Sequence, residues 1–133
     1  SDLYDRKVAA CPTYFPGAGC SLSASYINTF HDRFWTGLVD EWQPIDDLGY
    51  GDDLDTYYDE LYAFYEQHQD EFVDDYAATN PSEDIAESFA YFVFSPKPAG
   101  DTVAEQKVLF FYEYPELVTL RSEILASFCQ LEE

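Results

Sequence analysis

The chain alternates between stretches whose apolar residues recur every three or four positions and short polar stretches rich in proline, glycine and aspartate. Apolar residues at this spacing lie on one face of an α-helix, so each stretch predicts a helix with one buried side. The first stretch is "SLSASYINTFHDRFWTGLVDEW". We expect Ser21 or Ser23 to cap this helix and Pro44 to end it. Residues 43–53, "QPIDDLGYGDD", are expected to form a loop.

Two further helical segments are expected in the middle of the chain. Asp53 is a suitable cap for the first of them, because its carboxylate can accept a free N–H group at the helix start. The apolar stripe of this helix comprises Leu54, Tyr58, Leu61, Tyr65 and His68. A shorter helical segment is expected from Glu71 to Ala77. Asn80 then begins a helix that ends before "SPKPAG".

The last third of the chain predicts two more helices. Thr102 and Glu105 have the spacing of a capping box, and Pro115 suits a first helical position. The apolar face of the last helix comprises Leu117, Leu120, Ile124 and Phe128. A strand competes with a helix only in "KVLFFYEY", which is short and aromatic. The prediction is one all-α domain over residues 1–133, with five or six helices, short loops and an irregular first segment of about 21 residues.

The composition argues against several classes of function. The chain has 27 acidic and 6 basic residues, a formal net charge of −21. Phosphate backbones and anionic membranes would be repelled, so nucleic acid and membrane surfaces are not expected partners. No apolar run reaches the roughly 20 residues that span a bilayer. The 12 tyrosines and 11 phenylalanines indicate a packed core rather than an acidic disordered tail.

The helix expected after Asn80, "NPSEDIAESFAYFVF", has an unusual distribution of charge. Its apolar arc comprises Ile85, Ala86, Phe89, Phe92 and Val93, and a narrow polar strip comprises Asp84, Ser88 and Ser95. Glu83 and Glu87 lie one turn apart on a third arc, where like charges repel by roughly 0.2–0.5 kcal/mol. Capping and the helix dipole explain Glu83 but not Glu87. The pair is therefore either a solvated acidic face or a place for a positive group.

This segment, with "FVDDYAAT" before it, resembles the downstream glutamate segment of gluzincin-type zinc metallopeptidases, and most of all the branch related to anthrax lethal factor. In that family H-E-x-x-H supplies two imidazoles and a general base, and a glutamate on a later helix supplies the third zinc ligand. The resemblance implies that Glu83 is this ligand and that Glu87 holds a ligand imidazole through its free N–H. It also implies that Tyr76 donates a hydrogen bond to the substrate oxyanion.

The sequence contains no H-E-x-x-H, and its two histidines are not paired at helical spacing. His31 is followed four residues later by Trp35, and His68 by Phe72. We therefore expect the histidine helix to lie upstream of Ser1 in a longer zinc peptidase. This chain would be its C-terminal subdomain, inactive and without zinc when alone. Its partners would be that upstream helix and the peptide substrate.

A second interpretation belongs to a different class. The chain would be a non-catalytic, acidic helical module whose aromatic clefts bind a basic protein partner. The acidic stretch "DDLGYGDDLDTYYDE" lacks the D-x-D-x-D-G order of an EF-hand loop, so it does not predict a specific calcium site. No serine or cysteine stands in a recognisable nucleophile context.

The three cysteines leave two alternatives open. The Pro-Gly turn in "CPTYFPGAGC" can bring Cys11 and Cys20 together as a disulfide, or both can remain thiols. A disulfide closing so short a loop stabilises by roughly 2–3 kcal/mol and would fit an extracellular or cell-envelope protein. Cys129, beside Phe128 on an apolar helix face, is expected to be a small buried hydrophobe.

Overall fold

The computed structural model describes Tyr4–Asp5, Cys20–Ser21 and residues 25–132, and the statements below concern these residues. They form α1 (Tyr26–Phe34), α2 (Val39–Leu48), α3 (Leu54–Gln67), the 3-10 turns η1 (Gln69–Glu71) and η2 (Tyr76–Thr79), α4 (Pro81–Phe94), α5 (Val103–Tyr112) and α6 (Pro115–Glu132). The prediction of an all-α domain is confirmed. The β structure in these ranges is a two-residue antiparallel pairing of β1 (Tyr4–Asp5) with β2 (Cys20–Ser21).

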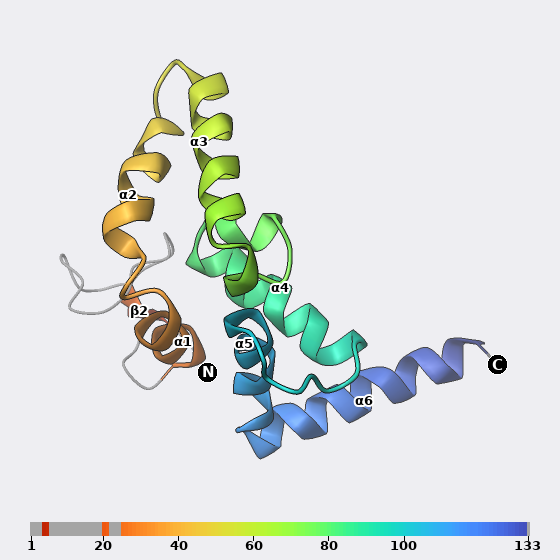
Figure 1. Ribbon diagram of the computed structural model, residues 1–133. Helices are drawn as coiled ribbons and strands as arrows, with labels where there is room; N and C mark the ends of the chain where they lie inside the picture. Colours follow the sequence, from red (N-terminus) through yellow and green to blue (C-terminus); the bar gives the residue numbers. More distant parts are fainter. Residues whose placement is uncertain (1–3, 6–19, 22–24, 133) are drawn as a thin grey trace.

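The helices surround α4, which packs against η2, α1, α5 and α6 (Figure 1). At one end α2 and α3 form an antiparallel hairpin that projects from the rest of the molecule. At the other end the second half of α6 extends away from the other helices. None of the described helices has the length and apolar character needed to cross a membrane.

The core is built mainly from aromatic rings. Its buried apolar residues are Phe30, Trp35, Leu38, Trp42, Phe64, Phe72, Ala77, Ala78, Phe92, Val93, Val108, Phe110, Phe111 and Leu117. Phe30 packs edge-on against Phe110 with 5.6 Å between ring centroids, and Trp35 packs in the same way against Trp42 at 5.5 Å. Edge-to-face contacts of this kind are favoured by the ring quadrupoles. Ring contacts in the core therefore join α1 to α5, and the residue that follows α1 to α2.

The first predicted helix is two helices. The caps expected at Ser21 and Ser23 are wrong, because Ser25 is the capping residue and its Oγ accepts the N–H of Asn28 at 3.1 Å. α1 ends at Phe34, and the next residue, Trp35, is completely buried. The chain then turns, and α2 begins at Val39.

Pro44 does not end a helix, as expected, but lies inside α2. Its missing N–H would have bonded the carbonyl of Asp40, which is exposed, so water can bond that carbonyl instead. Residues 43–48 are thus helical rather than part of the expected loop, which shortens to residues 49–53. Asp53 caps α3 as predicted, and its Oδ1 accepts the N–H of Thr56 at 3.1 Å.

Three other expectations need correction. Residues 72–75 are not helical, so the segment expected from Glu71 to Ala77 is represented only by the ends of two 3-10 turns. In α3 the stripe residues Leu54 and Tyr58 are exposed, and the buried residue is Phe64. The far part of the expected α6 face is exposed at Phe128, because α6 extends beyond its neighbours there.

Candidate functional site

The first turn of α4 forms as the sequence predicts. The side chain of Asn80 accepts the N–H of Glu83 at 2.8 Å, and Pro81 occupies the first helical position. Glu83 is half-buried in this turn, where the free N–H groups favour a negative charge. Its position is therefore explained by the helix start alone.

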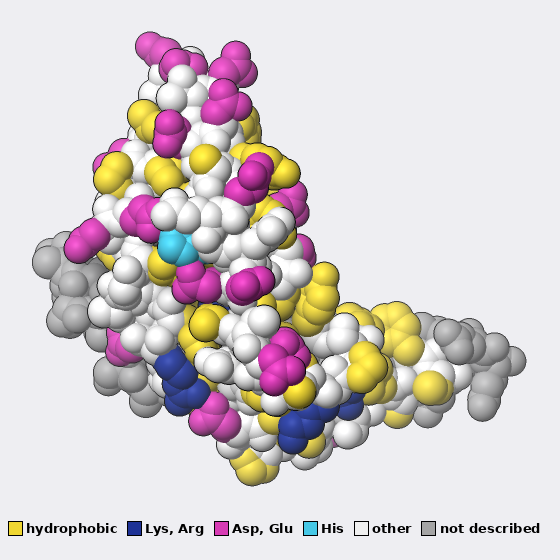
Figure 2. Space-filling model, in the orientation of Figure 1, with side chains coloured by type: hydrophobic (Ala, Val, Ile, Leu, Met, Phe, Trp, Pro, Cys, Tyr) yellow, Lys and Arg dark blue, Asp and Glu magenta, His cyan; other side chains and the backbone are white. Residues whose placement is uncertain are grey.

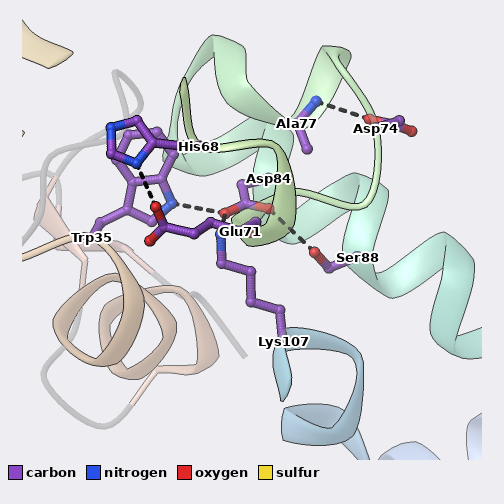
Figure 3. Close-up of polar contacts among 8 residues, drawn as sticks. All are labelled: Trp35, His68, Glu71, Asp74, Ala77, Asp84, Ser88 and Lys107. Atoms are coloured by element: carbon purple, nitrogen blue, oxygen red, sulfur yellow. Dashed lines mark hydrogen bonds and ion pairs between the residues drawn. The ribbon is translucent and has the colours of Figure 1, made fainter. Parts of the chain in front are cut away.

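Glu87, one turn further, lies in an acidic group that the sequence only partly revealed. A hydrogen bond with Asp74 is the main cause that raises the pKa of Glu87, followed by burial and by the charges of Asp74, Glu83 and Asp75. Asp74 is fixed in turn, because its Oδ1 accepts the N–H of Ala77 at 2.9 Å (Figure 3). The carboxylates at this surface thus repel one another unless a proton or a cation is present.

Tyr76, the remaining residue implied by the resemblance, lies close by in sequence. Tyr76 begins η2 and is 58% exposed, so its hydroxyl is open to solvent or to a partner. The described residues include no cluster of three His, Cys, Asp or Glu side chains arranged to hold a metal ion. Glu83 and Glu87 can therefore serve a zinc ion only if imidazoles come from outside this chain, and the roles of Tyr76, Glu83 and Glu87 stay predictions.

The polar strip of α4 is in the core rather than on the surface. Asp84 and Ser88 are completely buried, and so is Lys107 of α5. Lys107 Nζ lies 2.7 Å from Oδ2 of Asp84, and the same oxygen accepts the indole N–H of Trp35 at 2.9 Å (Figure 3). Ser88 donates to the other carboxylate oxygen at 3.2 Å. Lys107 also donates to the main-chain carbonyl of Glu71 at 2.5 Å.

This network links α4, α5, η1 and Trp35, the residue that follows α1, through hydrogen bonds to charged groups. Burial raises the pKa of Asp84 and lowers the pKa of Lys107, and in each case the other partner offsets the effect of burial. Because both side chains are closed to solvent, we regard the pair as a structural element. Sequence analysis missed it, although a single lysine among the apolar residues of "KVLFFY" is a signal that a buried partner exists.

The two histidines lie on different elements, His31 in α1 and His68 at the end of α3. His31 is partly exposed in α1, and burial lowers its pKa, an effect that Asp32 partly offsets. His68 is the residue that ends α3. Burial lowers the pKa of His68, but contacts with Glu41 and Glu71 outweigh burial and place it above the ordinary 6.5.

The projecting α2–α3 hairpin, residues 39–67, has a distinctive surface. It contains no Lys or Arg, and its acids are Asp40, Glu41, Asp46, Asp47, Asp52, Asp53, Asp55, Asp59, Glu60 and Glu66. Figure 2 shows these acidic side chains gathered over the hairpin, while Lys and Arg side chains lie toward the opposite end. Among the acids, Tyr50 is 86% exposed, Tyr58 62% and Tyr62 57%.

A groove of about 610 Å³ lies between α1, η1 and α5. Arg33 and Glu113 line it and form an ion pair at 2.6 Å, with both side chains about half exposed. Its other lining residues are Phe34, Gly37, Leu38, Glu71, Val103, Gln106 and Leu109. None of the site residues implied by the resemblance lines this groove.

The cysteine predictions have different outcomes. Cys11 lies outside the described residues, so the predicted disulfide with Cys20 stays a prediction. Cys129 is an exposed free thiol rather than the small buried hydrophobe we expected, because the second half of α6 extends beyond the other helices.

Comparison of the chain with protein-family models, with curated proteins and with solved structures found no match. The resemblance to gluzincin-type peptidases stays a prediction drawn from "FVDDYAAT" and "NPSEDIAESFA".

Proposed function

We propose that the chain is an acidic helical binding module, and that its α2–α3 hairpin docks a basic segment of another protein. The observation that carries this proposal is the combination of exposed tyrosines with a surface that bears acids and no Lys or Arg. Large exposed aromatic side chains on a soluble domain are common at interaction sites. A uniformly acidic surface without them would serve solubility alone.

The exposed side chains follow one face of α3. Leu54, Tyr58 and Tyr62 are spaced four residues apart and are all exposed, so they form a continuous stripe. Asp55 and Asp59 follow on the adjoining face, because each lies one residue after a member of the stripe. A partner side chain that reaches the stripe therefore meets carboxylates at its edge.

Lysine and arginine are the side chains that this arrangement suits. A cation placed over a tyrosine ring gains about 0.5–1 kcal/mol at an exposed site, and more when water is excluded. The neighbouring carboxylates add charge-assisted hydrogen bonds and speed up the encounter of oppositely charged surfaces. The same acidic field disfavours anionic partners, which gives the surface its specificity.

The proposal is tested with a helical peptide rich in arginine and lysine. We expect it to bind with an affinity that falls as salt concentration rises, because the surface charges are screened. Tyr58→Ala should weaken binding about fivefold, which corresponds to roughly 1 kcal/mol. Tyr91→Ala is the matched control, since Tyr91 is exposed on α4, away from the hairpin. If wild type and Tyr58→Ala bind the peptide with equal affinity, the tyrosine does not contribute and the attraction is one of unspecific charge. That result would contradict the proposal.

We retain the peptidase subdomain as a second proposal, because one observation favours it. The charges of Asp74 and Glu83 raise the pKa of Glu87, and a nearby cation would relieve this repulsion. Zinc would require two further ligands, so the test uses a longer protein that includes an H-E-x-x-H helix. Glu83→Gln should then reduce zinc affinity more than Glu87→Gln, whose loss should be about 10–100-fold. Undiminished zinc affinity in both variants would exclude the roles assigned to these glutamates.

A further inference from the structure

His68 lies at the corner where α3 meets η1, and both nitrogens of its ring contact carboxylates. Nε2 lies 2.8 Å from Oε2 of Glu41 on α2. Nδ1 contacts Oε2 of Glu71 on η1 (Figure 3). The side chain is only 16% exposed, and its ring packs against Phe64 with 4.9 Å between centroids. The imidazole thus ties α2 to the end of its partner helix.

The two contacts impose a requirement on the protonation of His68. A neutral imidazole has one N–H donor and one nitrogen lone pair, whereas the imidazolium has two N–H donors. An ionised carboxylate accepts hydrogen bonds and is repelled by a lone pair. With both glutamates ionised, Glu41 and Glu71 can therefore be bonded together only while His68 is protonated.

The carboxylates of Glu41 and Glu71 differ in how easily each can move away from the imidazole of His68. Glu71 is three residues from His68, and Lys107 holds its main-chain carbonyl at 2.5 Å. Glu41 is on a different helix, and its side chain is 42% exposed, so it can rotate into solvent. When His68 loses its proton, the bond to Glu41 is thus the one that breaks.

We propose that His68 is a pH-operated clasp, which ties α2 to the α3–η1 corner when protonated and frees α2 when neutral. The inference goes beyond the proposed binding function and does not depend on it. It rests on both ring nitrogens meeting carboxylates, one from each of two elements.

The charged surroundings of His68 set the pH at which the clasp opens. Among the described residues, Glu41 faces it from α2, Glu71 from η1 and the uncharged Phe64 from α3. The ammonium of Lys107, from α5, is held on the other side of Glu71 and is paired with Asp84. The folded pKa of His68 is raised, so the clasp stabilises fully below the unfolded value near 6.5 and is lost as pH rises through the folded pKa.

The first test is an NMR titration of the imidazole protons in the whole chain. We expect His68 to titrate above 6.5 and His31, the internal comparison, to titrate below it. Glu41→Gln should lower the His68 midpoint by about one pH unit. Glu60→Gln removes the same charge from an exposed position on α3, eight residues before His68, and it should leave the midpoint nearly unchanged.

The second test measures amide exchange, expressed as protection factors so that the intrinsic effect of pH is removed. Protection in α2 should fall as pH rises through the His68 midpoint, while protection in α5 stays constant. In Glu41→Gln the pH dependence in α2 should disappear. A His68 midpoint at or below 6.5, a midpoint that Glu41→Gln does not move, or α2 protection that is independent of pH would each overturn the clasp.

Discussion

Replacement of Lys107 by methionine tests the buried network at the centre of the fold. The change keeps most of the side-chain volume and removes the cation 2.7 Å from Asp84. The carboxylate keeps the donors from Trp35 and Ser88, but its charge is left buried without a counterion. Breaking a buried pair in this way costs about 3–5 kcal/mol. For a domain of this size the thermal midpoint should fall by about 10–20 °C.

The assay is chemical and thermal unfolding at pH 7, with Lys97→Met as the control. Lys97 is exposed and lies over the ring of Tyr112 at 4.8 Å, so its loss should cost less than about 1 kcal/mol. Addition of Asp84→Asn to Lys107→Met should restore part of the lost stability, because it removes the unpaired charge. The stability deficit of Lys107→Met alone should also shrink as pH falls, since protonation neutralises Asp84. A deficit below about 1 kcal/mol would refute this account of the network.

Three further predictions concern single positions. Gly100 has a φ of +93°, and an added Cβ would lie 2.8 Å from Leu109 Cδ1. Gly100→Ala should therefore destabilise the fold by more than about 1 kcal/mol in urea unfolding. Gly37→Ala is the control and should cost less, because nothing lies within 4 Å of the added Cβ. Asn80→Ala removes the cap of α4 and should cost about 1 kcal/mol, measured in the same way. The raised folded pKa of Glu87 means that its contribution to stability is lost as pH rises through that value. Glu87→Gln should therefore be as stable as wild type or more stable at pH 7, and clear destabilisation in a thermal scan would show that a structural bond depends on this carboxylate.

Local signals in the sequence predicted much of the helical framework. Asp53, Asn80, Thr102 and Pro115 each mark the start of a helix in the structure, because capping depends on residues within one turn. Where a helical pattern contains a residue that usually ends a helix, the sequence alone did not show which signal prevails. Pro44 lies inside α2, where the carbonyl of the exposed residue Asp40 loses its helical bond and water can bond it instead.

The contacts between helices could not be read from periodicity. Asp84 and Ser88 belong to the polar strip of α4, and a polar strip on a helix normally predicts exposure to solvent. The strip is buried because Lys107, from α5, and Trp35, which follows α1, supply hydrogen bonds to Asp84. The clasp at His68 was missed for the same reason, since Glu41 precedes it by 27 residues.

The candidate site was predicted in part. The charge repulsion between Glu83 and Glu87 could be predicted from their four-residue spacing. The effect of Asp74 on Glu87 could not, because it depends on the turn between η1 and η2. The exposure of Tyr58 and Tyr62 was not foreseen, because tyrosines at helical spacing usually face a core. No helix of the described residues covers that side of the hairpin, and only the tertiary structure reveals this.

The most direct test of the proposed function is to map where a basic peptide binds. Backbone amide resonances of the chain are followed by NMR while an arginine- and lysine-rich helical peptide is added. We predict that the shifts concentrate in residues 50–66, with small changes in α5 and α6, and that Tyr58→Ala and Tyr62→Ala together abolish them. Shifts spread evenly over all acidic surfaces, or concentrated around Glu83 and Glu87, would contradict the assignment of binding to the α2–α3 hairpin.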